Sequence, residues 1–143
     1  MDLVKKKRLL RSTMTALELC AGQGRVTKEF ISMYYRKVSL HDQSECLKTD
    51  WEALNEDLRK RRGKNKCEIG DMLICDLKDI DLGEEHYDLI YGNWSIFNYS
   101  RSRNEVMIAL QKCHKALSGL TPGMLICKET TRYEGDPITF HKE

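Results

Sequence analysis

The sequence predicts one α/β domain with a mostly parallel sheet and helices on both of its faces. Short apolar segments that suit buried strands alternate along most of the chain with segments of helical spacing. The strand candidates are apolar on consecutive residues, which is typical of parallel strands covered on both sides. A chain of 143 residues is long enough for one such domain. We assign residues 15–143 to this domain and residues 1–14 to a basic N-terminal segment.

The first half of the domain is expected to run strand, helix, strand, helix. An apolar run over 15–21 suits a buried strand, and apolar residues on one helical face follow over 26–34. A second strand is predicted at 37–42. The most regular helix is predicted over 47–58, where apolar residues recur at spacings of four, three and four, and Ser44 is its candidate N-cap.

The second half is expected to add two strands, a helix and a final strand. Buried strands are predicted at 72–75 and 87–94, on either side of an acidic loop. Helical spacing recurs over 106–117, and a Pro-Gly turn leads into a fifth strand at 124–128. The predicted sheet is truncated after this fifth strand. Its exposed edge would be a liability unless a partner chain covers it.

Composition narrows the possible classes of protein. No apolar run approaches the roughly 20 residues that span a bilayer, and no apolar segment follows the basic start as in a secretory signal. The six cysteines form no Cys-x-x-Cys pair, so we expect no metal site and reduced thiols in the cytoplasm or nucleus. Two basic clusters, at 5–11 and 59–66, permit nucleic-acid binding, although solvated surface is the simpler interpretation.

Two features point to a ligand at the ends of the first two strands. Gly22 and Gly24 follow the first strand, where ligands bind in open parallel sheets and where glycine lets a ligand approach the backbone. The spacing matches neither the dinucleotide fingerprint nor a P-loop, so alone it also fits an ordinary turn. Asp42 ends the second strand, where a carboxylate can accept hydrogen bonds from a ribose or can cap a helix. Together they indicate a nucleoside-bearing cofactor.

The segment ELCAGQG, residues 18–24, resembles the Asp/Glu-x-Gly-x-Gly-x-Gly motif of class I S-adenosylmethionine-dependent methyltransferases. More narrowly, AGQGRVTK resembles the Gly-Ala-Gly-x-Gly-Arg-Val-Thr-Lys motif of the protein alpha-N-terminal methyltransferase family. Similar stretches follow at 75–80, 87–100 and 113–129, so the resemblance covers roughly 15–135. It implies the Rossmann-like sheet of class I methyltransferases, S-adenosylmethionine as cofactor, and a protein N-terminal α-amino group as substrate.

The resemblance also implies which residues hold the cofactor: Gly22, Gly24, Arg25, Asp42, Leu77, Lys78 and Asn93. The two glycines, Arg25 and Asn93 would lie against the methionine part, with the Arg25 guanidinium facing its carboxylate. Asp42 would bind the ribose, and the pair at 77 and 78 would contact the adenine ring.

Departures from the family pattern leave alternatives open. Cys20 stands where the motif has its first glycine. The family's catalytic positions hold Asn98 and Thr130, which cannot take a proton from an ammonium group, so Asp136 is the candidate base. One alternative is therefore a catalytically degenerate, methyltransferase-like scaffold or subunit of a larger complex. A weaker one is an RNA-directed methyltransferase or binding module that uses the basic clusters.

Overall fold

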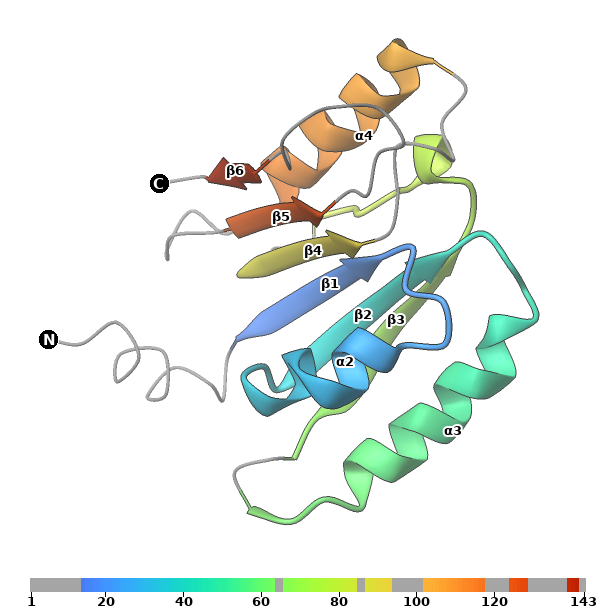
Figure 1. Cartoon of the computed structure of the whole chain (residues 1–143), viewed down its shortest axis with the longest axis vertical. Coiled ribbons are helices and arrows are strands. Elements are labelled where there is room, and N and C mark those ends of the chain that lie inside the picture. Colours follow the sequence, from blue (N-terminus) through green and yellow to red (C-terminus); the bar gives the residue numbers. More distant parts are fainter. Residues whose placement is uncertain are drawn as a thin grey trace, which may run out of the picture.

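The computed structural model in Figure 1 describes residues 14–63, 66–84, 87–93, 102–117, 124–128 and 139–141. Its strands form a single sheet in the order β3-β2-β1-β4-β5-β6. Neighbouring strands from β3 to β5 are parallel, and β6 pairs antiparallel with β5. The strands are β1 Thr15–Leu19, β2 Lys37–Asp42, β3 Glu68–Ile74, β4 Leu89–Asn93, β5 Met124–Lys128 and β6 Thr139–His141.

Helices cover both faces of this sheet, as Figure 1 shows, with α2 and α3 on one side and α4 on the other. Their bounds are α2 Arg25–Glu29, α3 Leu47–Arg59 and α4 Arg103–Ala116, with short 3-10 helices η1 Ile31–Met33 and η3 Leu77–Asp79. Alternate residues of β1 pack in the cores on the two faces of the sheet. Ala16 packs in the core under α3, and Leu17 and Leu19 pack in the core under α4 and η3. The predicted α/β architecture is therefore confirmed.

The strand order places a topological switch point beside β1. The chain runs from β1 through β2 to β3 on one side and then returns to place β4 against the other side of β1. In such sheets the loops on either side of the switch separate and leave room for a ligand at the carboxyl ends of the strands. The glycine segment after β1 lies at this edge.

Within the described residues the sheet has six strands, whereas the sequence predicted five. The additional strand β6 is only three residues long, and the backbone of Thr139–His141 pairs with Ile126, Leu125 and Met124. A segment of three residues is too short to show an apolar pattern. Its position is defined by its pairing with β5. The sequence predicted an exposed sheet edge at β5, but β6 of the same chain pairs with β5 there.

The predicted helix over 26–34 is also divided in two. The carbonyl of Lys28 accepts hydrogen bonds from the Ser32 hydroxyl and from the Arg61 guanidinium, each at 3.0 Å, where the first helix ends. Phe30 and Tyr34, which the spacing placed on a buried face, are 61% and 64% exposed. One arginine of the second basic cluster thus has a structural role at the junction of α2 and η1.

Two smaller differences concern the ends of elements. The N-cap of α3 is Cys46, without a side-chain hydrogen bond, so Ser44 is not the cap that the sequence predicted. The third strand begins earlier than predicted, at Glu68. Among the described helices, none combines the length and the apolar composition that a membrane span requires.

Candidate functional site

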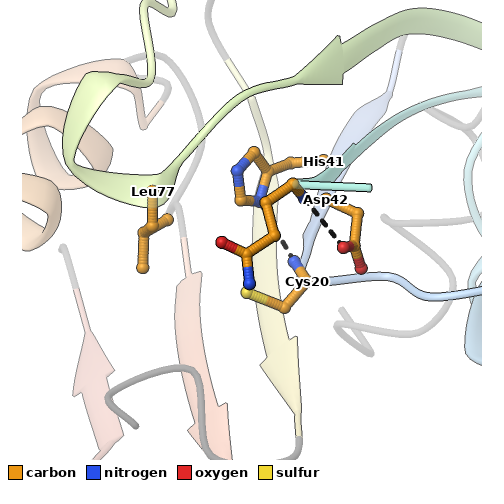
Figure 2. Close-up of a pocket in the computed structure, with 5 residues that line it drawn as sticks. Cys20, His41, Asp42 and Leu77 are labelled. Carbon is orange, nitrogen blue, oxygen red and sulfur yellow. Dashed lines mark hydrogen bonds between the residues drawn. The ribbon is translucent and has the colours of Figure 1, made fainter. Parts of the chain in front are cut away.

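A shallow pocket opens at the carboxyl ends of β1 and β2, beside η3. Figure 2 shows the five residues that line it, which come from three separate segments of the chain: Cys20, His41, Asp42, Gln43 and Leu77. The first follows β1, the next three lie at the end of β2, and Leu77 is the buried first residue of η3. The pocket therefore lies at the ligand-binding edge that the strand order predicts.

The end of β2 holds three successive backbone amides of the loop after β1. The Cys20 amide donates to Nδ1 of His41 at 3.2 Å, and the Ala21 amide donates to the His41 carbonyl at 2.8 Å. The Gly22 amide donates to Oδ2 of Asp42 at 2.9 Å. Because the same two residues accept all three bonds, the path of the loop is fixed relative to the Asp42 carboxylate.

Helix α3 holds the same loop from the other side. The indole Nε1 of Trp51 donates a 2.7 Å hydrogen bond to the Gly22 carbonyl, and the Trp51 side chain is fully buried. A buried indole N–H needs a partner, and here that partner is the glycine loop. The regular apolar spacing that predicted α3 therefore also supplies a support for the site.

Glycine is required at the two motif positions for different physical reasons. Gly22 has φ +56°, and a Cβ built on it would meet no atom within 4 Å, so its face is open to a ligand. Gly24 has φ +81°, and a Cβ there would lie 2.6 Å from Cδ2 of Leu54. Gly22 therefore suits close approach of a cofactor, whereas Gly24 allows helix α3 to pack against the loop.

A buried acid lies directly beneath the loop. Glu18, in β1, is only 2% exposed, and its Oε2 accepts a 3.1 Å hydrogen bond from the Thr27 hydroxyl of α2. Burial raises the pKa of Glu18 to about 7, although the hydrogen bonds from Thr27 oppose this shift. The acid joins β1 to the helix that follows the glycine loop.

The structure brings some of the predicted cofactor residues together and leaves others apart. Gly22, Asp42 and Leu77 lie around or beside the pocket. Arg25 begins α2, but its side chain is 85% exposed, and its Nε lies 3.4 Å from Oε1 of Glu29. Lys78 is exposed on η3 and does not line the pocket. The role of each in binding stays a prediction.

The remaining predicted residues lie at or beyond the limits of the described chain. Asn93 is the last residue of β4, where its backbone pairs with Lys128 of β5. The catalytic candidates Asn98, Thr130 and Asp136 lie outside the described residues.

Sequence reasoning missed His41, Gln43 and Trp51 as site residues. Gln43 and Trp51 carry no signal of their own, because an exposed loop amide and an apolar helix position are common. His41 did carry one, since it is an ionisable side chain in a strand that otherwise reads as buried. The histidine is the contact that a closer reading of the strand 37–42 would have identified.

The family model described as AdoMet dependent proline di-methyltransferase matches residues 2–141. This chain belongs to that family. The predicted resemblance is thereby confirmed, and so is the predicted cofactor, because the family depends on S-adenosylmethionine.

Individual relatives agree with this family and fold. The N-terminal Xaa-Pro-Lys N-methyltransferase 1 of Danio rerio is 30% identical over 124 residues, which are 86% of this chain and 50% of the relative. A SAM-dependent methyltransferase from Leishmania major matches with a TM-score of 0.63 at 21% identity, over 88% of this chain and 48% of that chain. An amino pentose methyltransferase from Micromonospora echinaspora, solved with SAM bound, matches with a TM-score of 0.61 at 16% identity, over 91% and 49% of the two chains. The chain thus spans about half the length of these relatives.

The pocket offers groups that fit part of the family's cofactor. The half-buried Asp42 carboxylate lies at its rim, the apolar Leu77 side chain forms one wall, and the open face of Gly22 is adjacent. Oδ1 of Asp42 accepts from the Gln43 and Ser44 amides at 2.7 and 3.4 Å, whereas Oδ2 accepts from the Gly22 amide and has room for a further hydrogen bond. The Asp42 carboxylate would suit a ribose hydroxyl, and the Leu77 side chain would suit an adenine ring.

Cys20 has a backbone conformation that favours glycine, the residue that the family motif carries at this position. Its φ is +50°, in the left-handed region that is unfavourable for a residue with a Cβ. We expect Cys20→Gly to raise the free energy of unfolding by about 0.5–1 kcal/mol, because relief of this strain outweighs the greater entropy of glycine in the unfolded chain. Urea denaturation measures the change. Cys20→Ala keeps the Cβ and removes only the sulfur, so an equal gain in that variant would contradict this explanation.

Proposed function

We propose that this chain binds S-adenosylmethionine in the Cys20–Asp42 pocket and methylates a protein N-terminal α-amino group. The observation that carries the proposal is the glycine loop held amide by amide on His41 and Asp42, with the face of Gly22 left open. The family description names proline as the methylated residue, and the Danio rerio relative is named for Xaa-Pro-Lys N-termini. A peptide with such an N-terminus is therefore the substrate to test first.

In this proposal the residues of the pocket bind and orient rather than react. Asp42 would accept hydrogen bonds from the ribose hydroxyls, Leu77 would contact the adenine ring, and Gly22 would lie against the methionine part. Arg25 would exchange its exposed pairing with Glu29 for the methionine carboxylate, to which a guanidinium fork is well matched. The cofactor supplies an electrophilic methyl group, and in-line transfer depends mainly on how donor and acceptor are positioned.

The acceptor amine must be neutral before it can attack, because the lone pair of an ammonium is occupied by a proton. Asp136 remains our proposed acceptor of that proton. Since in-line transfer depends strongly on positioning, an acceptor of modest strength is compatible with slow turnover.

Mass spectrometry of a methylation reaction tests the proposal. The full chain, S-adenosylmethionine and a peptide that begins Ser-Pro-Lys should yield peptide that carries added methyl groups at its N-terminus. The matched control is the same peptide with an acetylated N-terminus, which has no basic amine there and should stay unmodified. Equal methylation of both peptides would contradict the proposed acceptor.

A second candidate is a cofactor-binding subunit that does not catalyse transfer. The observation that favours it is the Cβ and thiol of Cys20 in the pocket lining, where the family motif has glycine. This candidate predicts binding of S-adenosylmethionine without transfer to the free peptide, and transfer only in the presence of a partner chain. Turnover by the isolated chain would rule it out.

A further inference from the structure

His41 joins the ends of three neighbouring strands at the floor of the pocket. Its side chain is 1% exposed and lies near the end of β2. Nδ1 faces the Cys20 amide after β1 at 3.2 Å, and Nε2 faces the carbonyl oxygen of Cys75 after β3 at 3.0 Å. The ring therefore connects β1 and β3 across β2, and Figure 2 shows it next to the Cys20 backbone.

These two partners determine the tautomer of the ring. The Cys20 amide is a donor, so Nδ1 must be the unprotonated nitrogen that accepts. The Cys75 carbonyl is an acceptor, so Nε2 must carry the hydrogen. Only the neutral imidazole with its proton on Nε2 satisfies both contacts. A proton added to Nδ1 would place two donors against each other and remove the bond to Cys20.

The surroundings of the ring favour this neutral form. Burial lowers the pKa of His41 below its usual value, while the Cys75 carbonyl and the carboxylates of Asp42 and Asp76 oppose that shift. Among the described residues, Cys20 lies beside His41 in the pocket lining, and Cys75 supplies the carbonyl that Nε2 faces. The neutral state therefore prevails at and above neutral pH, and the charged state is reached only in acid.

The hydrogen bond from the Cys20 amide to His41 supports an unfavourable backbone conformation at Cys20. Cys20 has φ +50°, a conformation that this residue adopts only when its surroundings impose it. The next two amides bond to the His41 carbonyl and to Asp42, so a shift at Cys20 would move the loop that the cofactor is proposed to contact.

We propose that His41 is a positioning residue whose neutral imidazole holds the Cys20–Gly22 turn in its binding conformation, so that protonation of His41 weakens cofactor binding in acid. The ligand in this statement rests on the proposed function, whereas the tautomer and the bond to Cys20 do not. In the family motif a glycine would adopt this turn without support. The histidine therefore compensates for a cysteine at that position.

Two substitutions of His41 test the contacts of the two ring nitrogens separately. In His41→Asn the side-chain oxygen takes the place of Nδ1 and can still accept from Cys20, but it does not titrate. In His41→Gln the side-chain NH2 takes the place of Nε2 and can still donate to Cys75, but the acceptor for Cys20 is lost. The two variants are therefore matched in polarity and differ in the contact that the proposal invokes.

Calorimetric titration with S-adenosylmethionine at about pH 8 and about pH 5 tests the proposal, because the lower value lies well below the ordinary pKa of histidine and burial lowers the pKa of His41. The wild-type Kd should rise by about two- to tenfold more in acid than the Kd of His41→Asn, the range expected for loss of one hydrogen bond. His41→Gln should bind about two- to tenfold more weakly than His41→Asn at the higher pH. Titration of the cofactor amine is common to all three proteins and cancels in the comparison. Equal pH dependence in wild type and His41→Asn, or tight binding by His41→Gln, would overturn the proposal.

Nuclear magnetic resonance of the protein without ligand gives an independent reading. The imidazole nitrogens of His41 should show a protonated Nε2 and a bare Nδ1, and the Cys20 amide should exchange with solvent faster in His41→Gln than in His41→Asn. If S-adenosylmethionine does not bind wild type at all, the proposed function fails, while these spectra still decide whether His41 holds the turn. A proton on Nδ1, or equal exchange rates of the Cys20 amide in both variants, would overturn the proposed role of His41.

Discussion

Gly24→Ala is expected to lower the free energy of unfolding by about 2–4 kcal/mol, as the sum of overpacking and left-handed backbone strain. The new Cβ would lie 2.6 Å from Cδ2 of Leu54, in the core between the sheet and α3. Relief requires Leu54 to move within a core that also contains Leu40 and Leu58. Equilibrium denaturation in urea, with circular dichroism as the probe, measures the loss.

Gly22→Ala is the matched control, because it adds the same methyl group two residues away. Gly22 also has a positive φ, but no atom lies within 4 Å of the new Cβ. We expect a loss of about 1 kcal/mol from backbone strain alone. Equal losses in the two variants would show that packing against Leu54 is not the reason for glycine at position 24.

Glu18→Gln is expected to stabilise the protein in alkaline solution and to leave it unchanged in acid. The folded-state pKa of about 7 lies above the ordinary value of 4.5, so the folded chain holds the proton more tightly than the unfolded chain does. The associated stability is fully present below pH 4.5 and is lost as the pH rises through about 7. Glutamine remains uncharged and can still accept from Thr27, so at about pH 8 we expect a gain of about 2–3 kcal/mol.

Thermal and urea unfolding of both proteins at about pH 5 and about pH 8 measure this difference, since the carboxyl titrates between them. Glu52→Gln serves as the control because Glu52 is exposed on α3. A gain that is the same at both pH values would mean that Glu18 does not titrate in the folded protein as its burial implies.

Much of the fold follows from apolar patterning. The second and fifth strands have the predicted bounds, and α3 differs by one residue at its end, because buried strands and a regular amphipathic helix have strong periodic signals. The division of 26–34 into α2 and η1 could not be predicted from apolar patterning, since the junction is bonded by Arg61, which is distant in sequence. The short strand β6 has the same kind of cause, because pairing with β5 defines it.

The candidate site was only partly predictable. Gly22 and Asp42 were predicted from strand ends and from the family motif, and Leu77 from the family resemblance. Asp42 and Leu77 line one pocket, and the Gly22 amide bonds to Asp42 beside it. The hydrogen bonds that shape this pocket were not predictable, because the partners of His41 and Trp51 lie on other elements. A motif identifies the residues that face a ligand, whereas the residues that hold the loop depend on tertiary contacts.

The Asp42 carboxylate is the central element of the proposed site for S-adenosylmethionine. Calorimetric titration of the full chain with this compound should show saturable binding, and Asp42→Asn should raise the Kd by about 10- to 100-fold, as expected for loss of hydrogen bonds to a charged acceptor. The control Asp50→Asn removes an exposed carboxylate of α3 and should leave the Kd unchanged. No binding by wild type at millimolar ligand, or the same Kd in wild type and Asp42→Asn, would contradict the account.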